Sequence, residues 1–375
     1  MAPLERILFL AELNSVNGSS LRTFDLARAL AARGLEVVTV GSAGQTMTDK
    51  FKKAGLILRP YYRIHRRMLP YMLNSKILRL AETAQPQIVH ACNPRLSALA
   101  ARLARACRVP YAVTANDAAE CRLPINRSRR CGGLIASSQF LREWLVNNED
   151  IPKEAITVVH NGVEVEPPSK MPDHQEAVKL QAVPPRTPKA ADQPQPCAPV
   201  VGMIGRFASG AGHGCFLEAA RRIIAELPNV QFLIAGDGPG RYVRDRIEKA
   251  GLVKHTTILP VFLDYRHLLA SINVLLVPGV AEGQSRLILD AMACRRPVIA
   301  TGVGDNYEVI SDGENGLLVP RNDAEAFAAR TVCMLKDADF RHRITDSAFE
   351  WVRDRFSLAR MAKDTLAFYN RTLAE

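Results

Sequence analysis

Residues 7–40, which read ILFLAELNSVNGSSLRTFDLARALAARGLEVVTV, decide the fold. Two short apolar runs, at 7–10 and 36–40, flank a segment in which apolar residues recur every three or four positions. That spacing is typical of an amphipathic helix, and Gly34 supplies the residue that ends it. The stretch therefore predicts one strand-helix-strand unit and a parallel sheet.

The same alternation continues along the chain in two series. The first series predicts further strands at 87–90, 111–114, 133–136 and 157–159. The second predicts strands at 200–204, 231–235, 257–260, 274–277, 297–300 and 316–319. Two series of this kind predict an α/β protein with two doubly wound, Rossmann-like domains and a cleft between them. Ligands of such sheets bind at the carboxyl ends of the strands, so the motifs at those ends carry most information.

The two series are separated by a proline-rich interval. Residues 166–199 hold nine of the 23 prolines and no aromatic residue, which predicts a linker. The expected domains are 1–165 and 200–355, and residues 356–375 form a C-terminal helix that packs back on the body.

Composition excludes several classes of protein. With 375 residues, 47% hydrophobic and 23% charged, the chain is neither a peptide nor a disordered protein. No apolar run approaches the ~18 residues of a membrane span, and Glu5 stands where a signal peptide would be basic, so we expect a cytoplasmic protein. The eight cysteines and eight histidines show no metal-ligand spacing, which predicts free thiols and no metal.

Positive charge is concentrated in the first domain. Residues 1–165 hold 23 Lys and Arg against 13 Asp and Glu, a balance of +10, whereas the whole chain carries +11. Between Lys50 and Arg79 nine basic residues occur without an acidic one, and apolar residues interleave with them. This pattern suits a surface helix on an anionic membrane, and equally a solvated basic face with its apolar side in the core. No nucleic-acid module accompanies the charge, so we expect no nucleic-acid partner.

Glycine-rich turns follow the first strand of each predicted domain. Gly18-Ser19-Ser20 precedes the helix that begins near Leu21, and Gly205-Arg206 follows strand 200–204. Small residues let backbone N–H groups approach a phosphate or a sugar, and an arginine there can bind a diphosphate. An ordinary turn and a surface salt bridge are the alternatives. Gly236-Asp237-Gly238-Pro239-Gly240 lacks the spacing of a dinucleotide fingerprint.

The densest cluster of candidate residues is PGVAEGQSRLILDAMA, residues 278–293. A loop carries Glu282, and a helix begins near Gln284 with its first N–H groups able to bind an anion. Asp290 follows Glu282 by eight residues, so a loop carboxylate and a helix carboxylate can hold two hydroxylated parts of one ligand. Paired carboxylates also occur on helices that bind nothing.

In this order, the motifs resemble the retaining glycosyltransferases of family four, which have the GT-B fold. The likeness covers nearly the whole chain apart from the linker, and it rests on Gly18 near the N-terminal glycine loop and on six segments. They are ARGLEV at 32–37, NGV at 161–163, GR at 205–206, GDGP at 236–239, EG at 282–283 and DGENGLL at 312–318.

The resemblance implies transfer of a sugar from a nucleotide-diphosphate sugar to a glycan or lipid-linked acceptor in cell-surface polysaccharide synthesis. It implies that the second domain binds the donor, that the first binds the acceptor, and that no metal or other cofactor is needed. Candidate catalytic residues are Arg206, Glu282, Asn116 and Asp117. Candidate substrate-binding residues are Gly18, Ser19, Gly205, Gly236, Gly238, Gly283, Gln284, Ser285, Arg286, Leu287 and Asp290.

By position, Arg206 and the helix start at 285–287 would meet the diphosphate. Glu282 would meet a sugar hydroxyl, and Asp290 the ribose.

The chain also departs from the family pattern at four places. Ala211 stands for a lysine, Asp290 for a glutamate, Asn116 for a histidine, and Gln284-Ser285 for Phe-Gly. Arg286 is a candidate to supply the missing cation. The departures keep open a catalytically silent protein that binds a sugar nucleotide or a partner. A hydrolysing sugar-nucleotide epimerase shares the fold, and a nucleic-acid binder is the remaining alternative.

Overall fold

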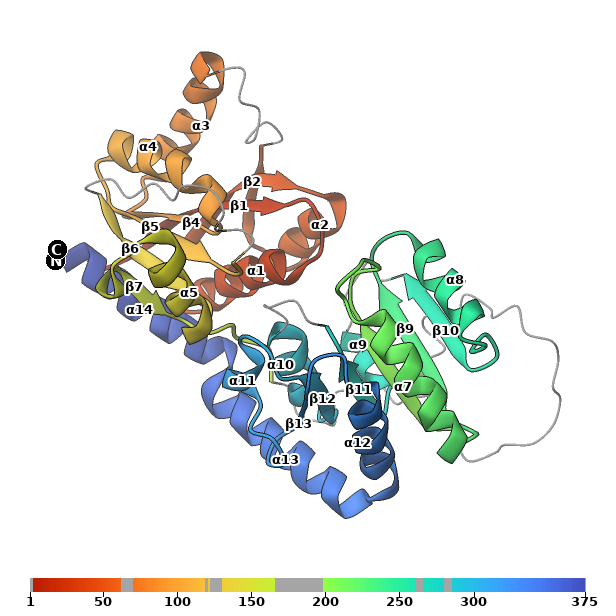
Figure 1. The fold of residues 1–375 in the computed structure, drawn as a ribbon. Helices are drawn as coiled ribbons and strands as arrows, with labels where there is room; N and C mark the ends of the chain where they lie inside the picture. The colour runs from red at the N-terminus through yellow and green to blue at the C-terminus, as the bar shows by residue number, and fades with distance from the viewer. Residues whose placement is uncertain are drawn as a thin grey trace. The chain divides into compact units, whose positions relative to one another are not determined.

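The computed structural model describes residues 3–61, 70–118, 121, 130–165, 198–260, 266–279 and 285–374. The chain forms two compact units, each built on one sheet (Figure 1). Unit 1 comprises Met1–Gly162 and Phe356–Glu375, and unit 2 comprises Val163–Arg355. Most of the predicted linker lies outside the described residues.

Unit 1 contains a seven-stranded sheet in the order β3-β2-β1-β4-β5-β6-β7, and its strand pairs are parallel. The strands are β1 (Arg6–Leu13), β2 (Glu36–Ala43), β3 (Ile57–Pro60), β4 (Ile88–Ala91), β5 (Tyr111–Ala115), β6 (Cys131–Ala136) and β7 (Ile156–Val158). The order reverses between β1 and β4, which is the switch point of a Rossmann-like sheet. Strand β3 was not expected, because this edge strand has four residues and ends in proline.

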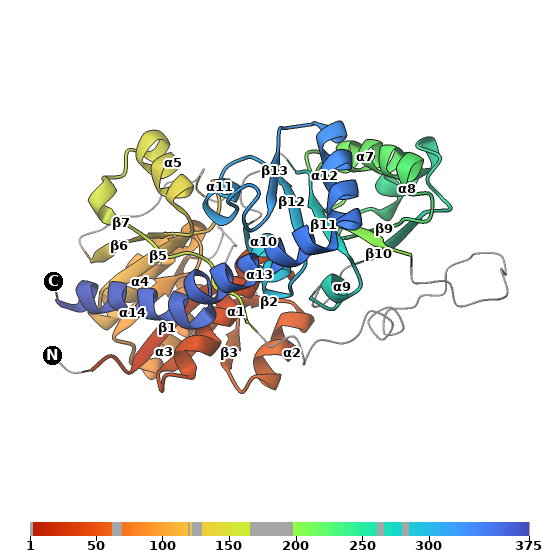
Figure 2. The same cartoon turned by 90° about the horizontal axis from the view of Figure 1, so that it is seen from below.

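Helices cover the sheet of unit 1, and the last helix of the chain is one of them. The helices are α1 (Gly18–Ala31), α2 (Gln45–Lys53), α3 (Pro70–Ala84), α4 (Ser97–Cys107), α5 (Gln139–Glu149) and α14 (Leu358–Ala374), with short 3-10 turns at Pro94–Leu96 and Lys153–Ala155. Helix α14 packs against α1 and β6 (Figure 2). A Cβ on Gly132 of β6 would lie 1.9 Å from Thr372 Cγ2, so the closeness of this packing requires glycine.

Unit 2 contains a six-stranded parallel sheet in the order β10-β9-β8-β11-β12-β13. The strands are β8 (Val200–Ile204), β9 (Gln231–Gly236), β10 (Thr256–Pro260), β11 (Val274–Val277), β12 (Val298–Thr301) and β13 (Leu317–Val319). The helices are α7 (His213–Glu226), α8 (Gly240–Lys249), α9 (Arg266–Ala270), α10 (Ser285–Ala293), α11 (Asn306–Val309), α12 (Ala324–Lys336) and α13 (Ala338–Arg355). The switch point lies between β8 and β11.

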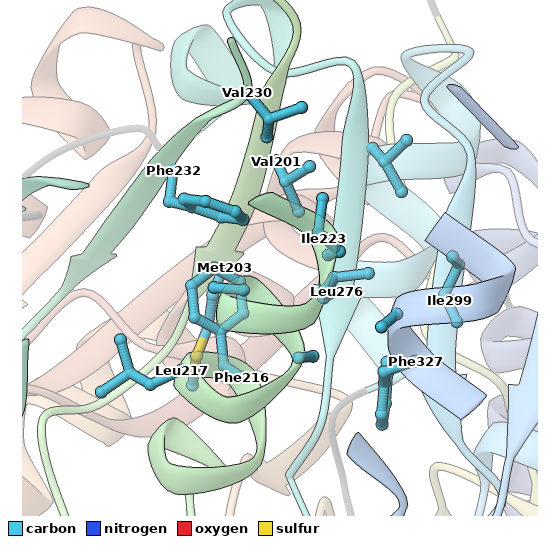
Figure 3. Close-up of a cluster of buried hydrophobic side chains, with 14 of the residues drawn as sticks. Val201, Met203, Phe216, Leu217, Ile223, Val230, Phe232, Leu276, Ile299 and Phe327 are labelled. Atoms are coloured by element: carbon cyan, nitrogen blue, oxygen red, sulfur yellow. The ribbon is translucent and has the colours of Figure 1, made fainter. Parts of the chain in front are cut away.

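The core of unit 2 forms between its sheet and α7 and α12 (Figure 3). Met203 and Leu276 project from neighbouring central strands toward Phe216 of α7, and Phe327 of α12 closes the cluster over Ile299. All five side chains are buried. Burial on both faces explains why these strands are near-continuous apolar runs in the sequence. The predicted α/β class with two Rossmann-like domains is confirmed.

The described part of the basic stretch mixes exposed charge with buried apolar residues. Lys76 and Arg79 of α3 are exposed, whereas Ile77 and Ala81 are buried in the core of unit 1. Residues 62–69 lie outside the described residues. Among the helices that the structure describes, none combines the length and the apolar character needed to cross a bilayer.

Candidate functional site

The loops that follow β8 and β9 meet at the carboxyl edge of the sheet in unit 2. A Cβ on Gly236 would lie 1.8 Å from the carbonyl oxygen of Gly205, so neither loop could approach the other with a larger residue at position 236. The backbone N–H of Phe207 donates to Asp237 O at 2.7 Å. Gly238 has a φ of +124°, in the region that favours glycine, and its backbone packs on Phe207. Predicted residues Gly205, Gly236 and Gly238 therefore form one glycine surface.

The start of α7 also approaches the loop after β11 closely, again at a glycine. Gly212 precedes α7 with a φ of +89°, and a Cβ there would lie 2.3 Å from Pro278 O. Because β8 and β11 flank the switch point, the loops after both strands converge where Rossmann-like sheets bind ligands. Arg206 follows β8 in this region, and its side chain is exposed, so a ligand from solution can reach it.

His213, the first residue of α7, is buried at this edge and does not supply charge. Its ring packs edge-to-face on Phe207 and Tyr242, with centroid separations of 6.0 and 5.9 Å. Burial, with a smaller effect of the Arg246 charge, lowers the pKa of His213 to about 4. The imidazole is therefore neutral at pH 7 and adds no positive charge beside the glycine surface.

Asp290 is a predicted site residue whose buried side chain lies beside two arginines. It lies in the second turn of α10, and its side chain is 1% exposed. Its Oδ2 lies 3.4 Å from Arg286 Nε, and its Oδ1 lies 3.9 Å from Arg266 Nε. Arg286 is itself mostly buried, with 11% of its side chain exposed. The structure thus pairs two predicted residues, Asp290 and Arg286, and adds Arg266, which sequence analysis missed.

Three predicted residues of this cluster, Glu282, Gly283 and Gln284, lie outside the described residues. Ser285 begins α10, and the half-buried Leu287 follows in its first turn. The roles of these residues at a diphosphate or a sugar stay predictions.

Unit 1 brings two predicted residues together at its own switch point. Asn116 follows β5, and its Nδ2 donates to Ser19 Oγ at 2.9 Å and to Cys92 O at 3.2 Å. Ser19 lies in the first turn of α1, for which Asn17 is the N-cap and accepts from Ser20 N at 2.9 Å. Polar groups from the ends of β1, β4 and β5 therefore converge on one edge of the sheet.

The other predicted residues of unit 1 are less constrained. A Cβ on Gly18 would meet no atom within 4 Å, so close packing inside the protein does not require glycine there. Asp117 is half-buried beside Asn116. The structure therefore gives Asn116 and Ser19 a shared position and leaves the ligand roles of Gly18 and Asp117 as predictions.

A buried polar network beneath this edge was not expected from the sequence. His90 of β4 bridges Tyr369 OH at 2.5 Å through Nδ1 and Thr114 Oγ1 at 2.6 Å through Nε2. Burial, aided by the Arg22 charge, lowers the pKa of His90 to about 3, and burial raises the pKa of Cys92 to about 12. His90 and Cys92 are therefore neutral at pH 7, and the hydrogen bonds of His90 join β4 to α14 and β5.

Comparison with known proteins identifies the family. The model described as Glycosyltransferase Family 4 matches residues 16–167, and the model described as Glycosyl transferases group 1 matches residues 198–337. This chain belongs to the glycosyltransferases that these two models describe. The first match falls almost entirely in unit 1 and the second in unit 2, so this glycosyltransferase matches the family in both of its units.

Individual relatives agree with the family assignment. Alpha-D-kanosaminyltransferase from Streptomyces kanamyceticus is 28% identical over 172 residues, which are 45% of this glycosyltransferase and 44% of that relative. The chain thus aligns with less than half of that relative's length. Phosphatidyl-myo-inositol mannosyltransferase from Mycobacterium leprae (strain TN) is 24% identical over 368 residues, or 94% of this chain and 92% of the relative.

A solved structure shows the same fold. The crystal structure of Anabaena Alr3699/HepE in complex with UDP and glucose matches with a TM-score of 0.80 at 19% identity. The match covers 98% of this glycosyltransferase and 99% of that chain. The expectation of a GT-B fold is therefore confirmed.

Proposed function

We propose that this chain is a retaining glycosyltransferase that moves a sugar from a nucleotide-diphosphate sugar to a glycan or lipid-linked acceptor. The observation that carries the proposal is the glycine surface of unit 2, at the edge of the sheet where the loops after β8 and β9 pack together and the start of α7 contacts Pro278 after β11. Close backbone packing and a helix start at a switch point are what a diphosphate requires. Relatives named for lipopolysaccharide core, capsular polysaccharide and phosphatidyl-myo-inositol support a role in cell-surface polysaccharide synthesis.

In the proposed mechanism, the protein stabilises the charge that develops on the leaving diphosphate. Arg206, the backbone N–H groups at the start of α10 and Arg286 provide that stabilisation without a metal. Glu282 binds a hydroxyl of the transferred sugar, and Asp290 orients the ribose. Asn116 and Asp117 act on the acceptor side, where Ser19 and Gly18 line the first loop.

We further propose that the enzyme works in the cytoplasm at the inner face of an anionic membrane. The basic stretch between Lys50 and Arg79 supports this location, since Lys52, Lys53 and Arg59 are exposed along it. Lipid-linked acceptors reside at such a surface, and basic residues are attracted to its charge.

A donor screen tests the function. UDP-, GDP-, ADP- and TDP-sugars are each incubated with the chain and a set of glycan and lipid-linked acceptors, and product is detected by mass spectrometry. With the active donor, we expect Arg206→Ala to lower kcat/KM about ten- to a hundredfold, because one charge-assisted contact to the diphosphate is lost. Arg221→Ala, which removes an exposed arginine of α7, is the matched control and should retain activity.

The screen also separates the alternatives. The anomeric configuration of the product, read by NMR, decides between retention and inversion. A thermal shift with donor but no transfer to any acceptor would favour a silent binder. Donor consumption in the absence of acceptor would favour a hydrolysing epimerase.

A further inference from the structure

The buried carboxylate of Asp290 connects two arginines from different helices. Arg286 lies one turn earlier in α10, with its Nε 3.4 Å from Asp290 Oδ2. Arg266 is the first residue of α9, with its Nε 3.9 Å from Asp290 Oδ1. A buried carboxylate requires compensating charge, and here each oxygen faces a different guanidinium. The position of the Arg286 side chain is therefore tied to α9 through one carboxylate.

Arg266 has a second attachment point at the beginning of unit 2. Its Nη2 donates to the main-chain oxygen of Glu164 at 2.9 Å, and its Nη1 lies 3.7 Å from Glu164 Oε2. A guanidinium is planar, and its N–H groups point in fixed directions. Once Arg266 is attached to Glu164, only one edge of its guanidinium is directed at Asp290. The attachment thus restricts where the Asp290 carboxylate can lie.

The charges of this cluster explain how Arg266 affects the charge that Arg286 presents to a ligand. Arg266 and Arg286 are positive, and Asp290 and Glu164 are negative, so the four groups balance. Without Arg266, the charge of Arg286 would compensate a larger share of the buried Asp290 charge. Less of that charge would then act on an anion at the head of α10.

We propose that Arg266 is a positioning residue of the donor site: it holds Asp290 and, through Asp290, the guanidinium of Arg286 at the head of α10. This role rests on the proposed function, in which the first turn of α10 and Arg286 meet the diphosphate of a nucleotide sugar. Arg266 acts through Asp290 and requires no contact of its own with the donor.

A double-mutant cycle on the full chain tests this role. UDP, GDP, ADP and TDP are titrated by calorimetry, and the diphosphate that the wild type binds most tightly is carried through the series. Arg266→Gln keeps a polar side chain but removes the positive charge and the fixed set of guanidinium N–H donors. We therefore expect the Kd for the diphosphate to rise about tenfold. In the Asp290→Asn background the same substitution should change Kd less than about twofold, because the group through which Arg266 acts is altered.

Two further variants keep the result interpretable. Arg222→Gln removes an arginine that pairs with Glu325 between α7 and α12, and we expect it to bind the diphosphate like the wild type. Arg266→Lys keeps a positive charge near Asp290 without the guanidinium N–H donors, so the Kd for the diphosphate should rise several-fold. This variant tests the role of Arg266 even if Arg266→Gln fails to fold. Circular dichroism verifies the folding of each variant.

The outcomes separate the inference from the proposed function. Equal losses in the wild-type and Asp290→Asn backgrounds would overturn the inference, because Arg266 would then act by another route. An unchanged Kd in folded Arg266→Gln or Arg266→Lys would overturn it as well and leave the proposed function intact. A wild type that binds none of the four diphosphates would overturn the proposed function, and the inference with it.

Discussion

At the scale of single residues, His90 shows how burial converts an ionisable side chain into a structural one. Its two ring nitrogens bridge hydroxyls on α14 and β5. A neutral imidazole offers one donor and one acceptor, so one hydroxyl donates to the ring and the other accepts from it. Protonation would give the ring two donors and a buried charge, which explains the direction of its pKa shift.

This shift predicts how stability depends on pH. The pKa of His90 is about 3 in the folded protein and about 6.5 when unfolded, so the unfolded state binds more protons between these values. The free energy of unfolding should therefore fall as pH falls below 6.5, and His90 alone contributes a loss of about 3 kcal/mol by pH 4. Urea unfolding at several pH values should show a shallower dependence for His90→Gln than for the wild type.

The exposed His342 provides the control for this experiment. His342→Gln removes a histidine from the surface and should keep the wild-type dependence on pH. Identical slopes in His90→Gln and the wild type would show that His90 does not remain neutral in the folded protein.

At the scale of elements, the strands that could be predicted are those that recur in the sequence as clear apolar runs. Strands β8 and β11 have the bounds expected for them, because central strands buried on both faces are continuous apolar runs. Strand β3 was missed, since none of its four residues is fully buried and its pattern is weak.

Side-chain contacts across the fold were harder to predict than the strands. Arg266 and Asp290 are 24 positions apart, and no periodicity links them; their contact exists only because α9 packs beside α10. Ser19 and Asn116 were both named as candidates, yet their hydrogen bond depends on the order of β1, β4 and β5, which the sequence does not specify.

The packing of α7 on the loop after β11 can be tested with two glycines. Gly210 and Gly212 both have positive φ, at +85° and +89°, so alanine is strained at either position. A Cβ at Gly210 meets no atom within 4 Å, whereas one at Gly212 would collide with the Pro278 carbonyl. We expect Gly210→Ala to cost about 1 kcal/mol from backbone strain, and Gly212→Ala to cost at least about 1 kcal/mol more.

Urea unfolding monitors both variants, with the transition of unit 2 as the readout. The backbone penalty is common to both substitutions. The difference between their free energies of unfolding therefore measures the cost of the collision between Cβ at position 212 and the Pro278 carbonyl. Equal destabilisation would contradict this account of why position 212 is glycine.

At the scale of the whole molecule, the chain contributes to unit 1 from both of its ends. Met361, Phe368 and Tyr369 of α14 are buried against residues from β1, β4 and α1. Burial of apolar side chains is the main stabilising contribution in such a core, and the loss of one large side chain alone costs about 3–5 kcal/mol. Unit 1 should therefore not survive without its last helix.

Deletion of residues 356–375 is expected to unfold unit 1 and leave unit 2 folded. Hydrogen exchange followed by mass spectrometry should show loss of amide protection in β1, β2 and β4, while β8, β9 and β11 keep theirs. Removal of only the last two residues, of which Ala374 is exposed, is the control. Retained protection of β1 in the larger deletion would contradict the expectation.

The continuity of unit 2 has a consequence for how such genes can diverge. Val163–Arg355 is one uninterrupted run of codons framed by the two pieces of unit 1. A single inserted segment could replace it between related genes and leave the framing sequence intact, whereas an exchange of unit 1 would need matched breakpoints on both sides. Recombination can therefore diversify the inner module more readily than the outer one.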